Sequence, residues 1–334
     1  QEIIRLTAGK RIHGTGAIPG GVNKPMSIDE IRFLQEDIAQ KIGWAQGALA
    51  LIKKIFFEQY DSNMAFAAIE TSMVCLVRAD GAFELYHGGL RARNPLGATI
   101  FDHVDYVNYN DYIRESVKDW SYMKFPFITS LGEENGWYRV GPLARINNCD
   151  FIPTALAEAE RKEFVAIGNG LPVQSTMAYH WARLIELLHC TEAIAELLCD
   201  NDIVGKDLRT KGELQHHGTG VIEAPRGTLF HHYEVNDEGI ITKASLIVST
   251  TNNNQAMNES IRRVANQYLD GHRLTEALLN QVEVAIRAYD PCLSCATHAI
   301  GKMPMELNLV DSDGELVDRL EKRVTGQISR TLPG

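Results

Sequence analysis

The sequence has little of several features that mark common classes of protein. It contains 6 cysteines among 334 residues, too few for a disulfide scaffold. No apolar run is long enough to cross a bilayer, and the formal net charge of -10 argues against a nucleic-acid-binding surface. No internal repeat or low-complexity tract is present. We therefore expect a soluble protein of a reducing, cytoplasmic setting, whose hydrophobic content of 45% supports a substantial core.

The strongest chemical signal is the segment Asp290-Pro291-Cys292-Leu293-Ser294-Cys295-Ala296-Thr297-His298. Two thiols three positions apart can chelate one soft or borderline metal, because thiolate is the ligand that such metals select. A lone CxxC is weak evidence for structural zinc, which usually takes a second pair of ligands. A redox pair of the thioredoxin type is expected at a strand-to-helix turn, whereas this pair follows a predicted helix. Spacing alone leaves these alternatives open.

Three further features allow both a functional and a structural interpretation. Arg226 lies between a proline and a glycine, which suits a guanidinium held toward an anion, although a surface salt bridge would look the same. The pair His216-His217 could supply ligands, but adjacent histidines point different ways in most backbones. The glycine-rich loop 9–24 lacks the end of a Walker loop and is either a surface turn or backbone packed on a buried site. The remaining cysteines are expected to be buried small side chains: Cys75, Cys149, Cys190 and Cys199.

Hydrophobic periodicity predicts a helix-rich α+β fold without a clear domain boundary. A capping box of Ser27 and Glu30 begins a long helix whose apolar repeat runs to Ile52. The other predicted helices span 109–119, 154–164, 175–199, 258–269 and 275–289. The predicted hairpins pair 73–77 with 83–86, 228–234 with 239–248, and 305–310 with 315–319. Residues 120–143 are expected to be irregular.

Four segments, taken in order, resemble the large subunit of nickel–iron hydrogenases. Residues 9–24 are similar to its GRxxH…PGG loop, 140–145 to its VGPLAR stretch, 218–227 to its GxGxxEAPRG segment, and 290–298 to its DPCxxCxxH motif. The resemblance spans essentially the whole chain and implies that family's fold, a long-helix bundle with peripheral short β-hairpins. The residues at 292–298 and the asparagine-rich run after Thr251 look most like those of the cytoplasmic bidirectional, NAD(P)-linked group.

The resemblance implies a nickel–iron centre whose iron carries CO and cyanide ligands. Cys292 would be a terminal nickel ligand, Cys295 would bridge nickel and iron, and His298 would ligate magnesium in the mature protein. Hydrogen would be split reversibly and heterolytically, with either a cysteine thiolate or Arg226 accepting the proton.

The same resemblance assigns roles to residues around that centre. Arg226, next to Pro225, would hydrogen-bond one cyanide and overhang the open metal position, and Thr250 would donate to another cyanide. Asp290 would orient Arg226. Charge-assisted donors of this kind are strong at low dielectric.

Two departures from the family pattern determine whether we expect a mature subunit or a precursor. The family's N-terminal RxCGxC motif, which supplies two more thiolates, is absent, and residues 299–334 follow a histidine at which mature subunits normally end. We therefore expect a hydrogenase core at 1–298 and a maturation extension at 299–334, which would keep Cys292 and Cys295 from closing over the metals. This form would be an inactive precursor without an assembled centre.

Expected partners follow from the same family. Electrons would leave through an iron–sulfur small subunit, since this chain has no cysteines left to hold such clusters. Diaphorase subunits carrying NAD and flavin, nickel chaperones and a processing endopeptidase would be further partners. The alternatives are a non-catalytic, quinone-binding relative of the respiratory-complex type, which the presence of Cys292, Cys295 and Arg226 disfavours, and an unrelated CxxC zinc or redox protein.

Overall fold

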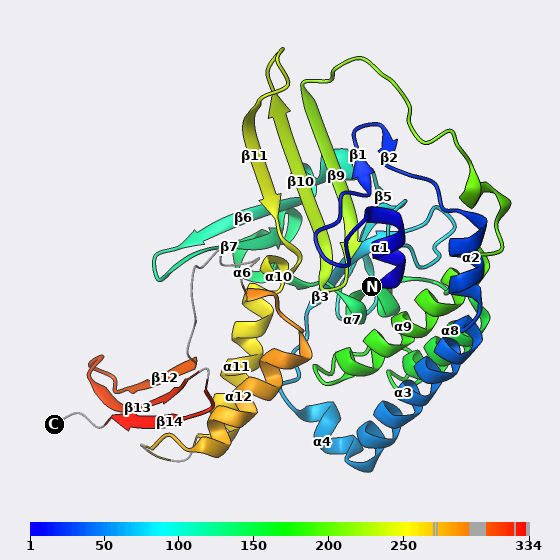
Figure 1. The fold of residues 1–334 in the computed structure, drawn as a ribbon. Coiled ribbons are helices and arrows are strands. Elements are labelled where there is room, and N and C mark those ends of the chain that lie inside the picture. Colours follow the sequence, from blue (N-terminus) through cyan, green and yellow to red (C-terminus); the bar gives the residue numbers. More distant parts are fainter. Residues whose placement is uncertain (270, 272, 294–304, 324, 332–334) are drawn as a thin grey trace.

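The computed structural model in Figure 1 describes residues 1–269, 271, 273–293, 305–323 and 325–331. Its α-helices are α1 (Glu2–Ala8), α2 (Ile28–Gln35), α3 (Ile38–Glu58), α4 (Tyr60–Ala65), α5 (Tyr109–Tyr112), α6 (Gly132–Asn135), α7 (Pro142–Asn148), α8 (Ala155–Ala166), α9 (Ala178–Leu197), α10 (Ser249–Asn252), α11 (Asn254–Tyr268) and α12 (Glu276–Ala288). Short 3-10 turns lie at η1 (Tyr106–Asn108), η2 (Thr129–Leu131) and η3 (Asn201–Val204).

The strands form small sheets around this helical part. They are β1 (Ala17–Ile18), β2 (Gly21–Val22), β3 (Ser72–Val77), β4 (Gly89–Arg93), β5 (Thr99–Val104), β6 (Ile113–Lys118), β7 (Ser121–Ile128), β8 (Tyr138–Arg139), β9 (His217–Ala224), β10 (Gly227–Val235), β11 (Ile241–Ile247), β12 (Met305–Val310), β13 (Leu316–Lys322) and β14 (Ile328–Thr331). The sheet orders are β1-β2, β5-β4-β3-β8, β6-β7, β11-β10-β9 and β12-β13-β14. All pairs are antiparallel except β3 with β8.

The helical layer is built on α3, α8 and α9, which lie side by side in Figure 1. Trp181 of α9 is fully buried, with its ring centroid 5.8 Å from Phe56 of α3 and 5.2 Å from Phe164 of α8. Burial of an aromatic side chain of this size contributes roughly 1.5–3 kcal/mol. This aromatic cluster therefore fixes how the three helices sit against one another.

The predicted long helix from Ser27 to Ile52 is two helices. The capping box is present, with the Glu30 amide donating to Ser27 Oγ at 3.2 Å and the Ser27 amide donating to the Glu30 carboxylate at 2.9 Å. The helix breaks at Asp37, whose φ of -123° is not helical. Aspartate competes for backbone hydrogen bonds and is a weak helix former, and a break of two residues does not disturb an apolar repeat.

The predicted hairpin of 73–77 with 83–86 is wrong in its second strand. The turn exists, since the Gly81 amide donates to Arg78 O at 2.8 Å, but Phe83 makes only one bridge to Val77. Its amide donates instead to Phe151 O at 2.8 Å. The true partner of β3 is β4, so a competing long-range contact replaced the local pairing.

The segment 109–143 also differs from the prediction. The expected helix over 109–119 covers only α5 and then becomes β6, which pairs with β7 inside the stretch expected to be irregular. Pro126 lies within β7, opposite Glu115. Proline lowers the weight of a strand prediction, but it is tolerated in an edge strand, as in this two-stranded ribbon.

The remaining predicted elements are confirmed within a few residues. Helices α8, α9, α11 and α12 and the pairs β10–β11 and β12–β13 lie where the periodicity places them. Strand β14 was not predicted, and it extends the last hairpin to three strands. This last sheet packs against α12 through buried Leu320, and the Leu274 amide donates to Asp318 Oδ2 at 2.8 Å.

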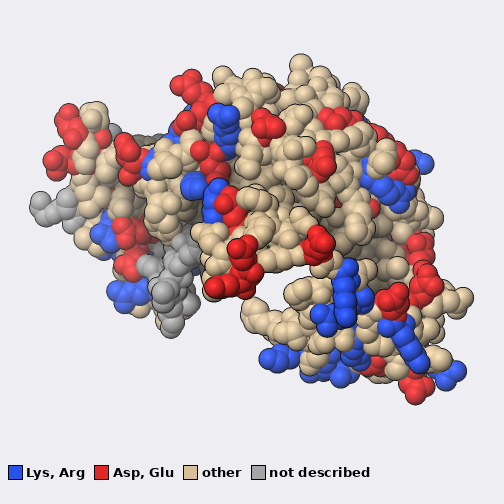
Figure 2. Space-filling view, turned by 90° about the horizontal axis from the view of Figure 1, so that it is seen from above, with Lys and Arg blue, Asp and Glu red and all other residues tan. Residues whose placement is uncertain are grey.

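The surface carries charges of both signs. Figure 2 shows acidic and basic side chains interspersed on the face seen from above, with uncharged residues between them. Among the described helices, none combines the length and the apolar composition that a membrane span requires.

Candidate metal centre

Three segments that are far apart in the sequence meet at one place. Arg226, in the turn between β9 and β10, donates from Nε to the Asp290 carbonyl at 2.6 Å, and its Nη2 lies 3.4 Å from Asp290 Oδ2. Thr250 of α10 accepts at Oγ1 a hydrogen bond of 3.0 Å from the Cys292 amide. The turn and α10 therefore each hold the backbone that follows α12, the first by a guanidinium and the second by a buried hydroxyl.

Two glycines set the position of Arg226. Gly227 has φ 134°, and a Cβ added there would lie 2.1 Å from Val140 Cγ2. Gly141 has φ 91°, and a Cβ added there would lie 2.9 Å from the Arg226 carbonyl oxygen. Side chains other than hydrogen are strained at these φ values and have no room here. The segments 140–145 and 218–227 thus pack backbone to backbone.

Buried Arg145 hydrogen-bonds the backbone of the same turn. Arg145 of α7 donates from Nη1 to the Ala224 carbonyl at 2.9 Å and from Nη2 to the Pro225 carbonyl at 3.3 Å. It also pairs with Glu186 at 2.5 Å and with Glu223 at 2.7 Å. One guanidinium of α7 therefore ties the end of β9 and the Pro225 backbone to α9.

The charges of this buried cluster are compensated. Burial by itself lowers the pKa of Arg145, but Glu186 and Glu223 outweigh it and raise that pKa above its usual value, so the guanidinium stays charged. Burial raises the pKa of Glu223, and hydrogen bonds from Arg145, Thr228 and the Leu76 amide oppose that rise. Buried charges persist only with partners of this kind.

The end of α12 is fixed by α9. Arg183 Nη2 donates to the Ala288 carbonyl at 2.9 Å, and the ring of Tyr289 lies 4.9 Å from the ring of Tyr179. The Tyr179 hydroxyl in turn donates to Val140 O at 2.9 Å. Asp290 then takes a left-handed φ of 52°, which aspartate tolerates better than most residues. The helix therefore ends in a bend that turns the Asp290 carbonyl toward Arg226.

The structure brings together four of the residues that the sequence pointed to: Arg226, Asp290, Cys292 and Thr250. Pro225 adds its carbonyl as an acceptor for Arg145, and its ring is exposed. Cys295 and His298 lie outside the described residues. The loop 9–24 is a largely exposed turn whose Gly20 and Gly21 pack against the backbone of Leu208 and Thr210, so the surface-turn interpretation holds.

The remaining cysteines within the described part of the chain differ in burial. Cys75 and Cys149 are buried as expected, and Cys190 is half-buried. Burial raises the pKa of Cys149 to about 12 and that of Cys190 to about 11, which keeps both as neutral thiols. The expectation for Cys199 is wrong, because it follows the last turn of α9 and is exposed.

Sequence reasoning missed the cluster of Arg145, Glu186 and Glu223. One signal was present in β9, where Val221 and Glu223 share the buried face and a carboxylate there needs a partner. A second signal was Glu186, which lies on the buried side of α9 between Ile185 and Leu188. Neither signal names the partner, because Arg145 is 41 residues from Glu186 and 78 from Glu223 along the chain.

The residues present suit a metal centre with anionic ligands. Cys292 offers a thiol that is only partly buried, and a thiolate is a strong ligand for nickel and iron. Arg226 brings a permanent positive charge to the same place. The Thr250 hydroxyl accepts from the Cys292 amide and still carries one hydrogen that it can donate.

Comparison with known proteins gives the same family throughout. The family model of nickel-dependent hydrogenase matches residues 86–298. The chain is 43% identical over 332 residues to the NAD-reducing hydrogenase HoxS subunit beta of Cupriavidus necator, covering 95% of this chain and 67% of that protein. It is 40% identical over 325 residues to an F420-non-reducing hydrogenase chain of Methanothermobacter thermautotrophicus, covering 96% of this chain and 68% of that one.

Solved structures agree in fold. A crystal structure of an NAD+-reducing NiFe-hydrogenase in the H2-reduced state matches with a TM-score of 0.86 and 51% identity, over 89% of this chain and 66% of that chain. An NiFeSe-hydrogenase of Dm. baculatum matches with a TM-score of 0.68 at 20% identity, over 89% and 66%, which shows the fold alone. The helix-rich α+β fold expected from the sequence is thereby confirmed. The chain spans about two thirds of the length of these relatives.

Proposed function

Because this chain belongs to the nickel-dependent hydrogenase family, we propose that it is the catalytic large subunit of a nickel–iron hydrogenase that cleaves H2 reversibly to protons and electrons. The observation that carries the proposal is the meeting of Arg226 and Thr250 with the segment Asp290–Cys292. When bound, a nickel–iron centre with CO and cyanide ligands on iron supplies the site of heterolytic H2 cleavage. Cys292 and Cys295 would hold the metals, and His298 would ligate magnesium.

The roles of the described residues follow from their contacts. Asp290 holds the Arg226 guanidinium through its carbonyl and its carboxylate, so the cation is oriented without being neutralised by a close bidentate pair. Thr250 fixes the backbone of Cys292, and therefore the place from which the thiol extends. A fixed cation next to a thiolate stabilises negative charge on that sulfur and on anionic ligands nearby. Of the two proton acceptors expected from the sequence, we propose the Cys292 thiolate, because an Arg226 guanidinium that keeps its charge has no site for a further proton.

The electron acceptor and the partners are part of the proposal. NAD(P) as acceptor, reached through an iron–sulfur small subunit and diaphorase subunits, is supported by the similarity to two hydrogenases named as NAD-reducing. A cytoplasmic location accompanies such an acceptor. We further propose that nickel chaperones and an endopeptidase act on this chain.

Residues 299–334 are proposed to be an extension that maturation removes, and the chain that carries it to be an inactive precursor without an assembled centre. Two observations support a boundary at 298. The family match ends at His298, and β12–β14 form a sheet of their own that packs on α12. Lys322 Nζ reaches Glu283 of α12 at 2.7 Å, so the extension is held on that helix by a partly exposed ion pair and apolar contacts.

The test uses the purified complex with its native partners, after residues 299–334 have been removed. Hydrogen uptake is measured with a viologen dye, which reports catalysis, and with NAD+, which reports the acceptor. We expect Cys292→Ser to abolish uptake with both acceptors and to lower the nickel content, and Cys199→Ser, on the exposed surface, to change neither. Full uptake by Cys292→Ser would refute the proposal. Uptake and nickel both absent from a wild-type complex that has lost residues 299–334 would favour the non-catalytic, quinone-binding relative, since only the chain that still carries this extension is proposed to be inactive.

A further inference from the structure

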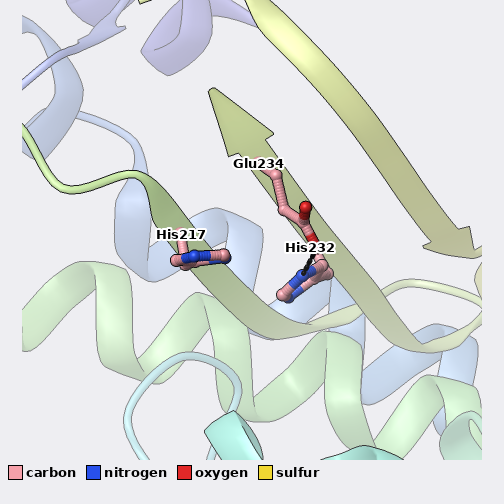
Figure 3. Close-up of side chains that lie close together, drawn as sticks. All are labelled: His217, His232 and Glu234. Carbon is pink, nitrogen blue, oxygen red and sulfur yellow. Dashed lines mark ion pairs between the residues drawn. The ribbon is translucent and has the colours of Figure 1, made fainter. Parts of the chain in front are cut away.

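A cluster of metal-ligating side chains lies at the other end of the β9–β10 pair. His217, His232 and Glu234 each direct one ligand atom to a common place, and these atoms all lie within 4.8 Å of one another (Figure 3). Figure 3 shows His217 on one strand and the other two residues on its neighbour. The cluster contains two imidazoles and one carboxylate, all at least partly accessible.

Strand geometry explains why these three side chains converge. His232 and Glu234 are two residues apart on β10, so they share one face of the sheet. His217 on β9 is the register partner of Glu234. Directly opposed residues of an antiparallel pair have Cβ atoms about 4.5–5.5 Å apart. His216, one residue earlier, points elsewhere and lies near Val235 O at 3.1 Å and Asp237 at 3.5 Å.

One imidazole is already oriented for a ligand. Thr219 Oγ1 lies 2.9 Å from His232 Nδ1, while His232 Nε2 lies 3.7 Å from Glu234 Oε1. A hydrogen bond at Nδ1 holds the orientation of the ring and leaves Nε2 for a ligand, as is usual for histidines that bind metals. The side chain of His232 is 19% exposed, so neighbouring residues limit its motion.

Lys243 pairs with Glu234 and would compete with a metal ion for this carboxylate. Lys243 Nζ lies 2.8 Å from Glu234 Oε1, and its side chain is 61% exposed. This hydrogen bond lowers the pKa of Glu234 and keeps the carboxylate ionised. An ion pair of this exposure contributes little to stability, so a doubly charged cation can displace the ammonium.

We propose that His217, His232 and Glu234 form a second metal site, which binds a borderline divalent transition metal of the kind of Zn2+ or Ni2+. Two imidazoles and one carboxylate are a ligand set that such ions favour, whereas Ca2+ and Mg2+ prefer oxygen ligands alone. Three protein ligands leave a position for water. The ion would join β9 to β10 at the end where the two strands leave the core.

This site is separate from the candidate centre at Arg226. The pair Ala224–Gly227, next to Arg226, and the pair His217–Glu234 are seven residue steps apart along β9. At about 3.3 Å per residue, this is roughly 23 Å. The inference does not rest on the proposed function, and it uses no residue of the proposed nickel–iron centre.

The experiment uses zinc as the probe, because zinc is distinguishable from the nickel and iron of the proposed centre. The full protein is dialysed against buffered ZnCl2 at pH 7.5, and bound zinc is counted by mass spectrometry over a range of free zinc concentrations. We expect the wild type to bind one zinc ion that the double variant His217→Ala/His232→Ala binds at least tenfold more weakly. His216→Ala is the matched control and should retain that ion.

Two measurements keep the test decisive if the double variant folds poorly. Lys243→Gln removes the competing ammonium and is expected to tighten zinc binding severalfold, a gain that loss of folding cannot produce. X-ray absorption at the zinc edge should show two imidazoles around the added ion. The proposal is overturned if the double variant binds zinc as the wild type does, if His216→Ala loses as much, or if Lys243→Gln leaves the affinity unchanged.

Discussion

The two ends of the β9–β10 pair place charged side chains in opposite situations. Near Ala224 and Gly227, the carboxylate of Glu223 is buried and bonded to Arg145, Thr228 and a backbone amide. Near His217 and Glu234, the polar groups are at least partly exposed, and their partners Thr219 and Lys243 are themselves partly or largely exposed. The same strand alternation places both sets. The difference teaches that burial decides whether a charge must be fully paired by the protein or can remain accessible to a ligand from solution.

The largest expected effect is at the buried end. Replacing Arg145 by methionine keeps much of the side chain's volume and leaves Glu186 and Glu223 without their cation. An uncompensated buried charge costs about 3–5 kcal/mol, so we expect the free energy of unfolding to fall by that amount. Urea denaturation followed by circular dichroism measures it.

Arg78→Met is the matched control, because Arg78 pairs with Asp80 on the surface at 2.8 Å. An exposed pair contributes little to stability, so Arg78→Met should change the free energy of unfolding far less than Arg145→Met does. If Arg145→Met and Arg78→Met lost the same free energy of unfolding, burial would not explain the difference between the two ion pairs.

A somewhat smaller effect is expected from the glycines that seat Arg226. Gly227→Ala puts a Cβ 2.1 Å from Val140 Cγ2 at a φ of 134°, so the turn must shift. Strain of this kind costs about 1–3 kcal/mol, and the displacement of Arg226 should lower hydrogen uptake by more than the stability loss alone explains. Gly220→Ala, on β9 with nothing within 4 Å of its added Cβ, should change both quantities little. Unchanged hydrogen uptake in Gly227→Ala would show that the geometry of this turn does not affect catalysis.

Local sequence signals explain which parts of this molecule were predictable. The long apolar repeats gave α9 and α12, and the Asn236–Gly239 turn gave β10 and β11. The strands around Pro126 were missed because proline lowers the weight of a strand prediction, although their pairing is local. The partner of β3 was missed because Phe83 bonds to the distant Phe151 instead of continuing the local hairpin.

The residues of the candidate site also differ in how far the sequence could predict their contacts. Arg226 and Asp290 are 64 residues apart, and only the order of family motifs suggested that they meet. Arg145 was within one of these motifs, but its role depends on Glu186 and Glu223, whose distance from it no local pattern encodes. The cluster of His217, His232 and Glu234 required the strand register, which a sequence read alone does not fix.

The contrast between buried and exposed groups also predicts pH dependence, with a smaller effect. His189 of α9 is buried, and this burial lowers its pKa, although Glu192 and Glu84 act in the opposite direction. The folded protein therefore binds this proton less readily than the unfolded chain, whose histidines titrate near about 6.5. The stability that neutral His189 permits is present above that pH and is lost as the pH falls through it toward the folded pKa.

His189→Gln should make the loss of stability between pH 7.5 and 5.5 less steep than in the wild type. The free energies of unfolding are measured by urea denaturation at each pH. Between pH 7.5 and 9 the two proteins should run parallel, since the imidazole is neutral in both states. A difference in slope above pH 7.5, or none below it, would contradict this assignment.

The smallest effect is expected at the exposed end in the absence of metal. With a chelator present, His232→Ala removes one hydrogen bond to Thr219 and a partly exposed ring, so the free energy of unfolding should change by about 1 kcal/mol or less. With zinc at about a hundredfold excess over its dissociation constant, the wild type should gain about 2.7 kcal/mol that the variant does not. A loss in chelator as large as that of Arg145→Met would mean that this end of the strand pair also depends on internal pairing, and the distinction between the two ends would fail.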